Sequence, residues 1–344
     1  MELTAASCPL SGDRFIVEYR ICGAEAEAEA LARDAALEQS VELPDALVTD
    51  PGLRQYVGRI ESNAPDGSEA RIVAVSYPVE LAHSVPAFLS VVYSNVSFYR
   101  RLRIHGVALP DSLLRTFPGP KFGLEGLRRK LGVSRPALVG TALKPVGASA
   151  RTLAEIAYAF AANGMEIIKE DHGLNDQACA PLGERVSACM AALDRAEQET
   201  GRPALYFANV TGGAGQTRDN AFRARDLGVS GVEILPGLCG FDEIRALAED
   251  RDFDLPIMMH PANLGGYAMS RDEGMSFAFL FGQLARLCGA DISAFPSFGG
   301  RFSIDREECR RTGAELSRPL GALRPAYSMA GGGQKIDRLR DTLE

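Results

Sequence analysis

The chain has 344 residues, of which 46% are apolar and 24% charged, and its formal net charge is −8. It contains no basic run, which argues against nucleic acid or an anionic membrane surface as a partner. Its seven cysteines lack C-x-x-C spacing, and no signal peptide or bilayer-spanning apolar stretch is recognisable. A reduced, cytoplasmic location is therefore expected.

A short tail at residues 1–12 precedes a region, residues 13–109, with the pattern of a small α+β domain. Alternating apolar and polar residues predict strands, and helical periodicity predicts two helices between them. The predicted strands are 14–21, 55–61, 70–77 and 93–104, and the predicted helices are 24–40 and 79–91. This β-α-β-β-α-β order is typical of a ferredoxin-like domain.

A linker is expected over residues 110–135, and the rhythm then changes. From 136 to 344, short apolar strands alternate with amphipathic helices, which is typical of parallel βα units. The strands are predicted at 137–143, 165–169, 204–208, 231–235, 256–260, 291–295 and 324–329. A closed (β/α) barrel has eight strands. The sequence therefore predicts a TIM-type barrel that lacks its last βα unit, with 137–143 and 324–329 as open edges.

Polar side chains follow these predicted strands. The second strand runs directly into Lys169, Glu170, Asp171 and His172. Desolvating such groups costs several kcal/mol unless they are paired or metal-bound, although a solvated turn with helix-capping residues would have the same local pattern.

Other predicted strands end near Lys144, His260, Arg301 and the glycines 331–333. In a parallel barrel all these ends lie on one rim, so the sequence predicts that an active site lies there.

The segments G-T-A-L-K-P at 140–145 and I-I-K-E-D-H at 167–172 resemble the large subunit of ribulose-bisphosphate carboxylase (RuBisCO). The corresponding family patterns are G-T-x-x-K-P-K and K-D-D-E. The stretch F-P-S-F-G-G-R-F at 295–302 is more similar to the RuBisCO-like (form IV) proteins, which share the fold but do not fix CO2.

Departures from the carboxylase pattern fit this second group. The second active-site lysine of the family is Val146 here, and the glutamate that closes the metal triad is His172. The arginine after the strand-five histidine is Pro261, and the flexible-loop lysine is Arg301. The resemblance therefore implies an enzyme that does not carboxylate.

The resemblance also implies a metal centre. Lys169, carbamylated by CO2, would bind Mg2+ together with Asp171 and the next residue, His172. A nitrogen ligand suits Mn2+ or another divalent ion at least as well. His172 could alternatively shuttle a proton, since its ordinary pKa is near neutral.

Further roles follow from the resemblance. Lys144 and His260 would move protons at an enediolate, and Arg301 with Gly331, Gly332 and Gly333 would hold phosphate. Family members share sites between two subunits, so Glu38 and Asn95 would complete the partner's site in a homodimer.

Three functions remain open from the sequence. The first is decarboxylation of the 3-oxo-isoapionate-4-phosphate type, because a metal with fewer anionic ligands keeps more positive charge for a carboxylate substrate. The second is 5-methylthioribulose-1-phosphate isomerisation, or enolisation of a diketo-methylthiopentyl phosphate, as in methionine salvage. The third is an inactive truncated or partner-dependent fragment, which one further βα unit would stabilise and activate.

Overall fold

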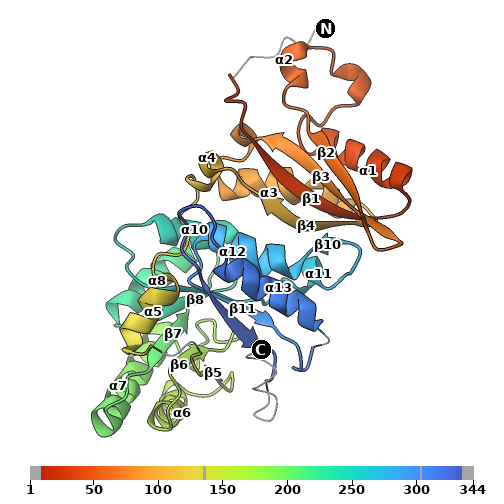
Figure 1. Cartoon of the computed structure of the whole chain (residues 1–344). Helices are drawn as coiled ribbons and strands as arrows, with labels where there is room; N and C mark the ends of the chain where they lie inside the picture. The colour runs from red at the N-terminus through yellow and green to blue at the C-terminus, as the bar shows by residue number, and fades with distance from the viewer. Residues whose placement is uncertain (1–8, 135–136, 303, 335–344) are drawn as a thin grey trace. The chain divides into compact units, whose positions relative to one another are not determined.

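The computed structural model describes residues 9–134, 137–302 and 304–334. The chain forms two compact units (Figure 1). The first consists of Met1–Phe117, Leu264–Leu287 and Glu307–Leu323, and the second of Pro118–Asn263, Cys288–Arg306 and Arg324–Glu344. The domain boundaries expected from the sequence, at 13–109, 110–135 and 136–344, stay predictions. Within the described ranges, no helix has the length and apolarity needed to cross a membrane.

The first unit is built on a five-stranded sheet with the order β10-β4-β1-β3-β2. Its strands are β1 (Arg14–Cys22), β2 (Arg59–Asp66), β3 (Ala70–Pro78), β4 (Leu102–Ala108) and β10 (Gly274–Met275). Strand β1 alternates buried and half-exposed residues and pairs antiparallel with both β3 and β4. This order confirms the predicted β-α-β-β-α-β arrangement, although β2 and β4 begin several residues later than expected.

Helices complete this unit. They are α1 (Glu25–Glu38), α2 (Pro51–Arg54), α3 (Val85–Tyr93), α4 (Asp111–Leu114), α11 (Gly265–Ala268), a π-helix (Ala278–Leu284), α12 (Ala285–Cys288) and α13 (Arg306–Ser317). The periodicity of residues 274–288 predicts one helix, but helical structure begins only at Ala278. Gly274 has a φ of +86°, and a Cβ there would lie 2.1 Å from the carbonyl oxygen of Tyr267, so this residue turns the chain into β10 instead.

The second unit is built on a seven-stranded parallel sheet with the order β12-β11-β9-β8-β7-β6-β5. The strands are β5 (Gly140–Leu143), β6 (Ile167–Glu170), β7 (Leu205–Asn209), β8 (Gly231–Ile234), β9 (Ile257–Met259), β11 (Ile292–Pro296) and β12 (Tyr327–Gly331). Each predicted strand is found within a few residues of its expected place. The predicted edge strands are β5 and β12, and the fold is an incomplete TIM barrel.

Helices α5 (Gly123–Leu131), α6 (Ala150–Ala162), α7 (Leu182–Thr200), α8 (Gln216–Asp226), α9 (Pro236–Cys239) and α10 (Phe241–Glu249) belong to this unit (Figure 1). Leu127 and Leu131 of α5 pack with Ile167, Phe207 and Met258 in a buried apolar cluster. The sheet interior is therefore filled by packed side chains, and the carboxyl ends of the strands are left for polar groups.

Candidate active site

The run of polar residues at the end of β6 divides between two faces of the strand. Side chains alternate along a strand, so Glu170 points away from its neighbour Lys169. Glu170 is fully buried and accepts hydrogen bonds from Arg185 Nε at 2.6 Å and Nη2 at 2.9 Å. Tyr206 Oη and the Asn209 backbone N–H also donate to it, at 2.5 Å and 2.8 Å. Glu170 therefore anchors α7 and β7 to β6 and is not free to hold a ligand.

Lys169 lies on the opposite face and is only 5% exposed. Its Nζ is 2.7 Å from Oε2 of Glu233, which follows Val232 in β8 and is 0% exposed. The same Nζ donates a hydrogen bond to the carbonyl oxygen of Glu170 at 2.7 Å. Burial raises the pKa of Glu233 to about 7, although the Lys169 ammonium opposes this rise.

Asp171 is the centre of a second cluster. Its Oδ1 is 2.8 Å from Nζ of Lys144, which follows β5, and 3.3 Å from Nδ1 of His172. Burial alone would raise the pKa of Asp171, but the hydrogen bond from Lys144 and the charges of His172 and Lys169 hold it below its ordinary value. Asp171 is therefore a carboxylate that contacts a half-exposed ammonium and an imidazole.

His260, directly after β9, stacks on His172 with the ring centroids 5.4 Å apart and the planes 16° from parallel. The backbone N–H of Ala262 donates to His260 Nδ1 at 3.1 Å, so that nitrogen carries no proton. Burial and the neighbouring charge of Lys169 lower the pKa of His260 to about 2. His260 is therefore a neutral imidazole with its proton on Nε2.

This protonation state can be tested directly, because the chain has only four histidines. In a long-range 1H–15N correlation spectrum, His260 is expected to show the Nε2–H tautomer and to remain unprotonated from pH 8 down to pH 5, approximately. The variant His260→Gln assigns the signal. A titration of this ring with a midpoint near the ordinary histidine value would contradict the expectation.

The loop after β6 is fixed by the end of β7. Asn209 Nδ2 donates to the carbonyl oxygen of His172 at 3.2 Å and to Asn175 Oδ1 at 2.6 Å. A cavity of about 480 Å³ lies beside this loop, lined by residues that include Asn175, Thr211 and Gln216. Because Asn209 is itself buried, it holds His172 in a fixed place at the rim.

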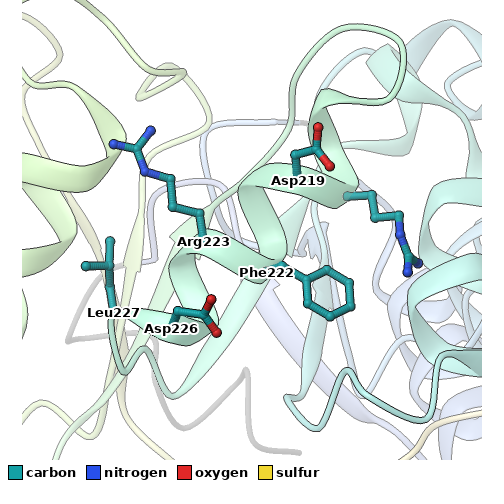
Figure 2. Close-up of a pocket in the computed structure, with 6 residues that line it drawn as sticks. Asp219, Phe222, Arg223, Asp226 and Leu227 are labelled. Atoms are coloured by element: carbon teal, nitrogen blue, oxygen red, sulfur yellow. The ribbon is translucent and has the colours of Figure 1, made fainter.

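Another hollow, of about 560 Å³, lies along α8 (Figure 2). It is lined by Arg218, Asp219, Phe222, Arg223, Asp226 and Leu227. None of the residues predicted for the active site lines it. Arg218 is paired with Asp250 at 2.6 Å, and Arg225 with Asp226 at the same distance. This hollow is therefore a charged helix surface rather than the candidate site.

The residues predicted to hold phosphate come together at the ends of β11 and β12. The Arg301 backbone N–H donates to the Gly332 carbonyl oxygen at 2.8 Å, and Gly332 and Gly333 each have a φ of +86°. A Cβ at Gly300 would lie 2.6 Å from that same oxygen, so the two loops approach this closely only with glycine there. Phosphate binding by this group stays a prediction.

Glu38 and Asn95, predicted to act across a dimer interface, contact each other in the first unit. Asn95 Nδ2 donates to Glu38 Oε1 at 2.7 Å, and both side chains are in contact with solvent. The structure therefore brings together two residues that lie 57 positions apart in the chain. Their role in the site of a partner subunit stays a prediction.

The donor set at β6 fits a divalent cation only if Lys169 is modified. Among the residues that the structure describes, no three His, Cys, Asp or Glu side chains form a metal-binding group. Asp171 and His172 supply two donors, and a carbamate on Lys169 would add hard oxygen donors. Glu233 Oε1 is buried without a hydrogen-bond partner, so the pocket contains an acceptor oxygen that its neighbours leave unsatisfied. These residues fit Mg2+ or Mn2+.

Comparison with known proteins bears on the family of this chain. Residues 123–344 match the family model described as ribulose bisphosphate carboxylase large chain, catalytic domain. The ribulose bisphosphate carboxylase-like protein 1 of Rhodopseudomonas palustris is 36% identical over 333 residues, which cover 96% of this chain and 89% of the relative. The chain belongs to the RuBisCO-like proteins of the RuBisCO large-chain superfamily.

Two further matches cover almost the whole chain. The 5-methylthioribulose-1-phosphate isomerase of Rhodospirillum rubrum is 32% identical over 335 residues, covering 96% of this chain and 87% of that protein. The crystal structure of a Rubisco-like protein from Rhodopseudomonas palustris superposes with a TM-score of 0.88 at 31% identity, covering 97% of this chain and 91% of that one.

One site residue of this RuBisCO-like protein is missed by sequence reasoning. Glu233 lies inside the apolar run G-V-E-I-L, where only its charge sets it apart from core residues. A single carboxylate in a buried strand needs a partner that offsets its charge. This need is the one signal in the sequence that could have pointed to Glu233. Its partner, Lys169, lies on a strand separated from β8 by β7.

Proposed function

We propose that this RuBisCO-like protein is a divalent-metal-dependent enzyme that forms an enediolate from a phosphorylated sugar and moves a proton between adjacent carbon and oxygen atoms. The observation that carries this proposal is the cluster around Asp171. An ammonium from Lys144 and an imidazole from His172 contact one carboxylate oxygen, and a neutral imidazole from His260 stacks against His172. Two groups able to handle protons therefore flank a carboxylate that can hold a metal.

Each side chain has a defined task in this proposal. Lys169 as a carbamate, Asp171 and His172 would hold the divalent ion, which when bound polarises a substrate carbonyl and acidifies the adjacent C–H bond. Lys144 is half-exposed, so its amine can take a proton from the substrate and return it.

His260 acts at a substrate oxygen rather than at carbon. Its Nε2–H can donate a hydrogen bond to a developing oxyanion, and it does so as a neutral imidazole because its pKa is lowered to about 2. Burial is the largest cause of this lowered pKa, and it acts on His260 whether or not Lys169 is modified. The neutral ring therefore stabilises the enediolate without adding to the positive charge of the site.

Proton transfer is favoured over decarboxylation by one feature of the structure. The sequence favours decarboxylation, because His172 replaces a negatively charged ligand and the metal would then keep more positive charge for a carboxylate substrate. Glu233, 2.7 Å from Lys169, returns a carboxylate to the site, so the argument for a carboxylate substrate loses its basis. The relative from Rhodospirillum rubrum, at 32% identity, is named as an isomerase of a sugar phosphate, which supports proton transfer on a substrate of that class.

The proposal is tested by supplying the purified protein with Mg2+ and 5-methylthioribulose 1-phosphate in deuterated water. We expect deuterium to enter the carbon next to the carbonyl, detected as loss of its proton NMR signal, and Lys144→Met to abolish this exchange. Parallel reactions contain a 3-oxo sugar-acid phosphate, to detect released CO2, and ribulose bisphosphate with labelled CO2, where no incorporation is expected. Turnover of the sugar acid without any exchange into the sugar phosphate would contradict the proposal.

A further inference from the structure

The cavity of about 480 Å³ beside the loops that follow β6 and β7 is separate from the predicted metal and phosphate groups, because none of their residues lines it. Its volume is typical of a site for a small molecule. The lining comes from these two loops, from the first half of α8 and from Leu238 of α9. Its polar side chains are those of Asn175, Asp176, Thr211, Gln216, Asp219 and Asn220.

Thr211 is the buried hydroxyl of this cavity. The residue is 7% exposed, and its Oγ1 accepts a hydrogen bond from the Leu235 N–H at 3.0 Å. The hydroxyl also has a proton to donate, and no group within the described ranges accepts it. A buried donor without an acceptor costs free energy, which an oxygen atom of a bound molecule would offset. Thr211 therefore indicates a ligand that can accept a hydrogen bond.

Two amide side chains add further donors. Asn175 Oδ1 accepts a hydrogen bond from Asn209 Nδ2 at 2.6 Å, so the NH2 group of Asn175 is left to donate. Gln216 Oε1 accepts from the Gly213 N–H at 2.9 Å, which leaves the NH2 group of Gln216 in the same state. The cavity therefore offers at least three donors from neutral side chains.

Three other side chains supply acceptors. Asn220 Nδ2 donates to the Val210 carbonyl oxygen at 3.3 Å, so its Oδ1 is left to accept. Asp176 Oδ1 accepts from the Leu182 N–H at 2.5 Å, and its second oxygen is not used. The carboxylate of Asp219 has neither a hydrogen-bond nor an ion-pair partner in the part of the chain that the structure describes. Donors and acceptors thus line the same cavity.

This lining disfavours an anion and a cation alike. An anion would meet two carboxylates, and no Lys, Arg or His is among the described lining residues. The N–H groups of Gly212 and Gly213 already donate to Thr217 Oγ1 and Gln216 Oε1, at 3.1 Å and 2.9 Å. An ammonium has only donors and would leave the amide groups unpaired, whereas a hydroxyl both donates and accepts.

We propose that this cavity binds a neutral polyol, the chemistry of an unphosphorylated sugar or sugar alcohol. Its hydroxyl oxygens accept from Thr211 and the two amide NH2 groups, and its hydroxyl protons are donated to Asp219 and Asn220. Leu238, which is 55% exposed, contacts the C–H groups of the polyol chain. The site needs neither a metal nor a phosphate, so it goes beyond the proposed function and does not rest on it.

The test is a titration of the purified full chain with ribitol, followed by saturation-transfer NMR. We expect saturable binding to the wild type. Asp219→Asn keeps the shape of the side chain but removes its charge, and it should weaken binding by about tenfold. Thr211→Val removes the buried hydroxyl and should weaken binding by at least about threefold. Asp219 is exposed, so its variant keeps the test decisive even if Thr211→Val does not fold.

Asp226→Asn is the matched control. Asp226 is an exposed aspartate of the same helix (Figure 2), where it pairs with Arg225 at 2.6 Å, and it does not line this cavity. Its replacement should leave ribitol binding unchanged. Lys169→Met should also bind ribitol as the wild type does, because the polyol does not occupy the metal centre. Circular dichroism establishes that each variant is folded.

Absence of saturable ribitol binding to the wild type would overturn the inference. Equal affinities in the wild type and in folded Asp219→Asn would overturn it as well, and loss of binding in Lys169→Met would place the polyol in the candidate active site instead. Parallel titrations use inorganic phosphate and putrescine, and binding of either at Asp219 without ribitol binding would also contradict a polyol site. The proposed function fails separately, through absent deuterium exchange.

Discussion

Replacing Glu170 by glutamine is expected to destabilise the protein by about 3–5 kcal/mol. Glu170 and Arg185 are both fully buried and joined by two hydrogen bonds, at 2.6 Å and 2.9 Å. Glutamine leaves the guanidinium of Arg185 buried without its counter-charge, and it also weakens the hydrogen bonds from Tyr206 and the Asn209 backbone. Urea unfolding followed by circular dichroism measures the loss.

The control for this variant is Glu155→Gln. Glu155 pairs with Arg151 at 3.1 Å on the exposed surface of α6, and its loss should cost less than about 1 kcal/mol. Glu170→Leu combined with Arg185→Met removes both charges and should recover part of the lost stability. Equal midpoints for Glu170→Gln and Glu155→Gln would contradict the structural role of Glu170.

Replacing Lys169 by methionine is expected to lower kcat/KM by about a thousandfold or more, equivalent to about 4 kcal/mol of transition-state stabilisation. Methionine keeps the length of the side chain but cannot take up CO2, so the donor set is reduced to Asp171 and His172. Lys169→Arg keeps the positive charge beside Glu233 and should be equally inactive. Lys130→Met, at an exposed position of α5, is the control and should retain activity.

The fold and the main cluster could be predicted because both depend on local patterns. Apolar runs separated by helical periodicity locate the seven parallel strands, and parallel pairing brings the residues that follow them to one edge. Lys144, Asp171, His172 and His260 follow three different strands and come into contact for that reason.

Other features depend on pairing in three dimensions and could not be predicted. Glu233 becomes a site residue only because its strand lies two positions from β6 in the sheet, which places its carboxylate against Lys169. The helix predicted from residue 274 begins later because Gly274 lies against the backbone of Tyr267 with a positive φ, and no sequence periodicity reports such a contact. From the sequence alone, Glu170 could be a metal ligand like its neighbours. Its buried ion pair with Arg185 of α7 shows that it stabilises the fold instead.

Calorimetric titration of Mg2+ into the protein, with and without bicarbonate, is the most direct test of a metal centre built on Lys169. We expect the wild type to bind Mg2+ much more tightly when bicarbonate is present, because a carbamate then adds oxygen donors to Asp171 and His172. Lys169→Met should show weak binding that bicarbonate does not change. Tight binding by Lys169→Met, or no effect of bicarbonate on the wild type, would contradict a carbamate-dependent metal centre at the end of β6.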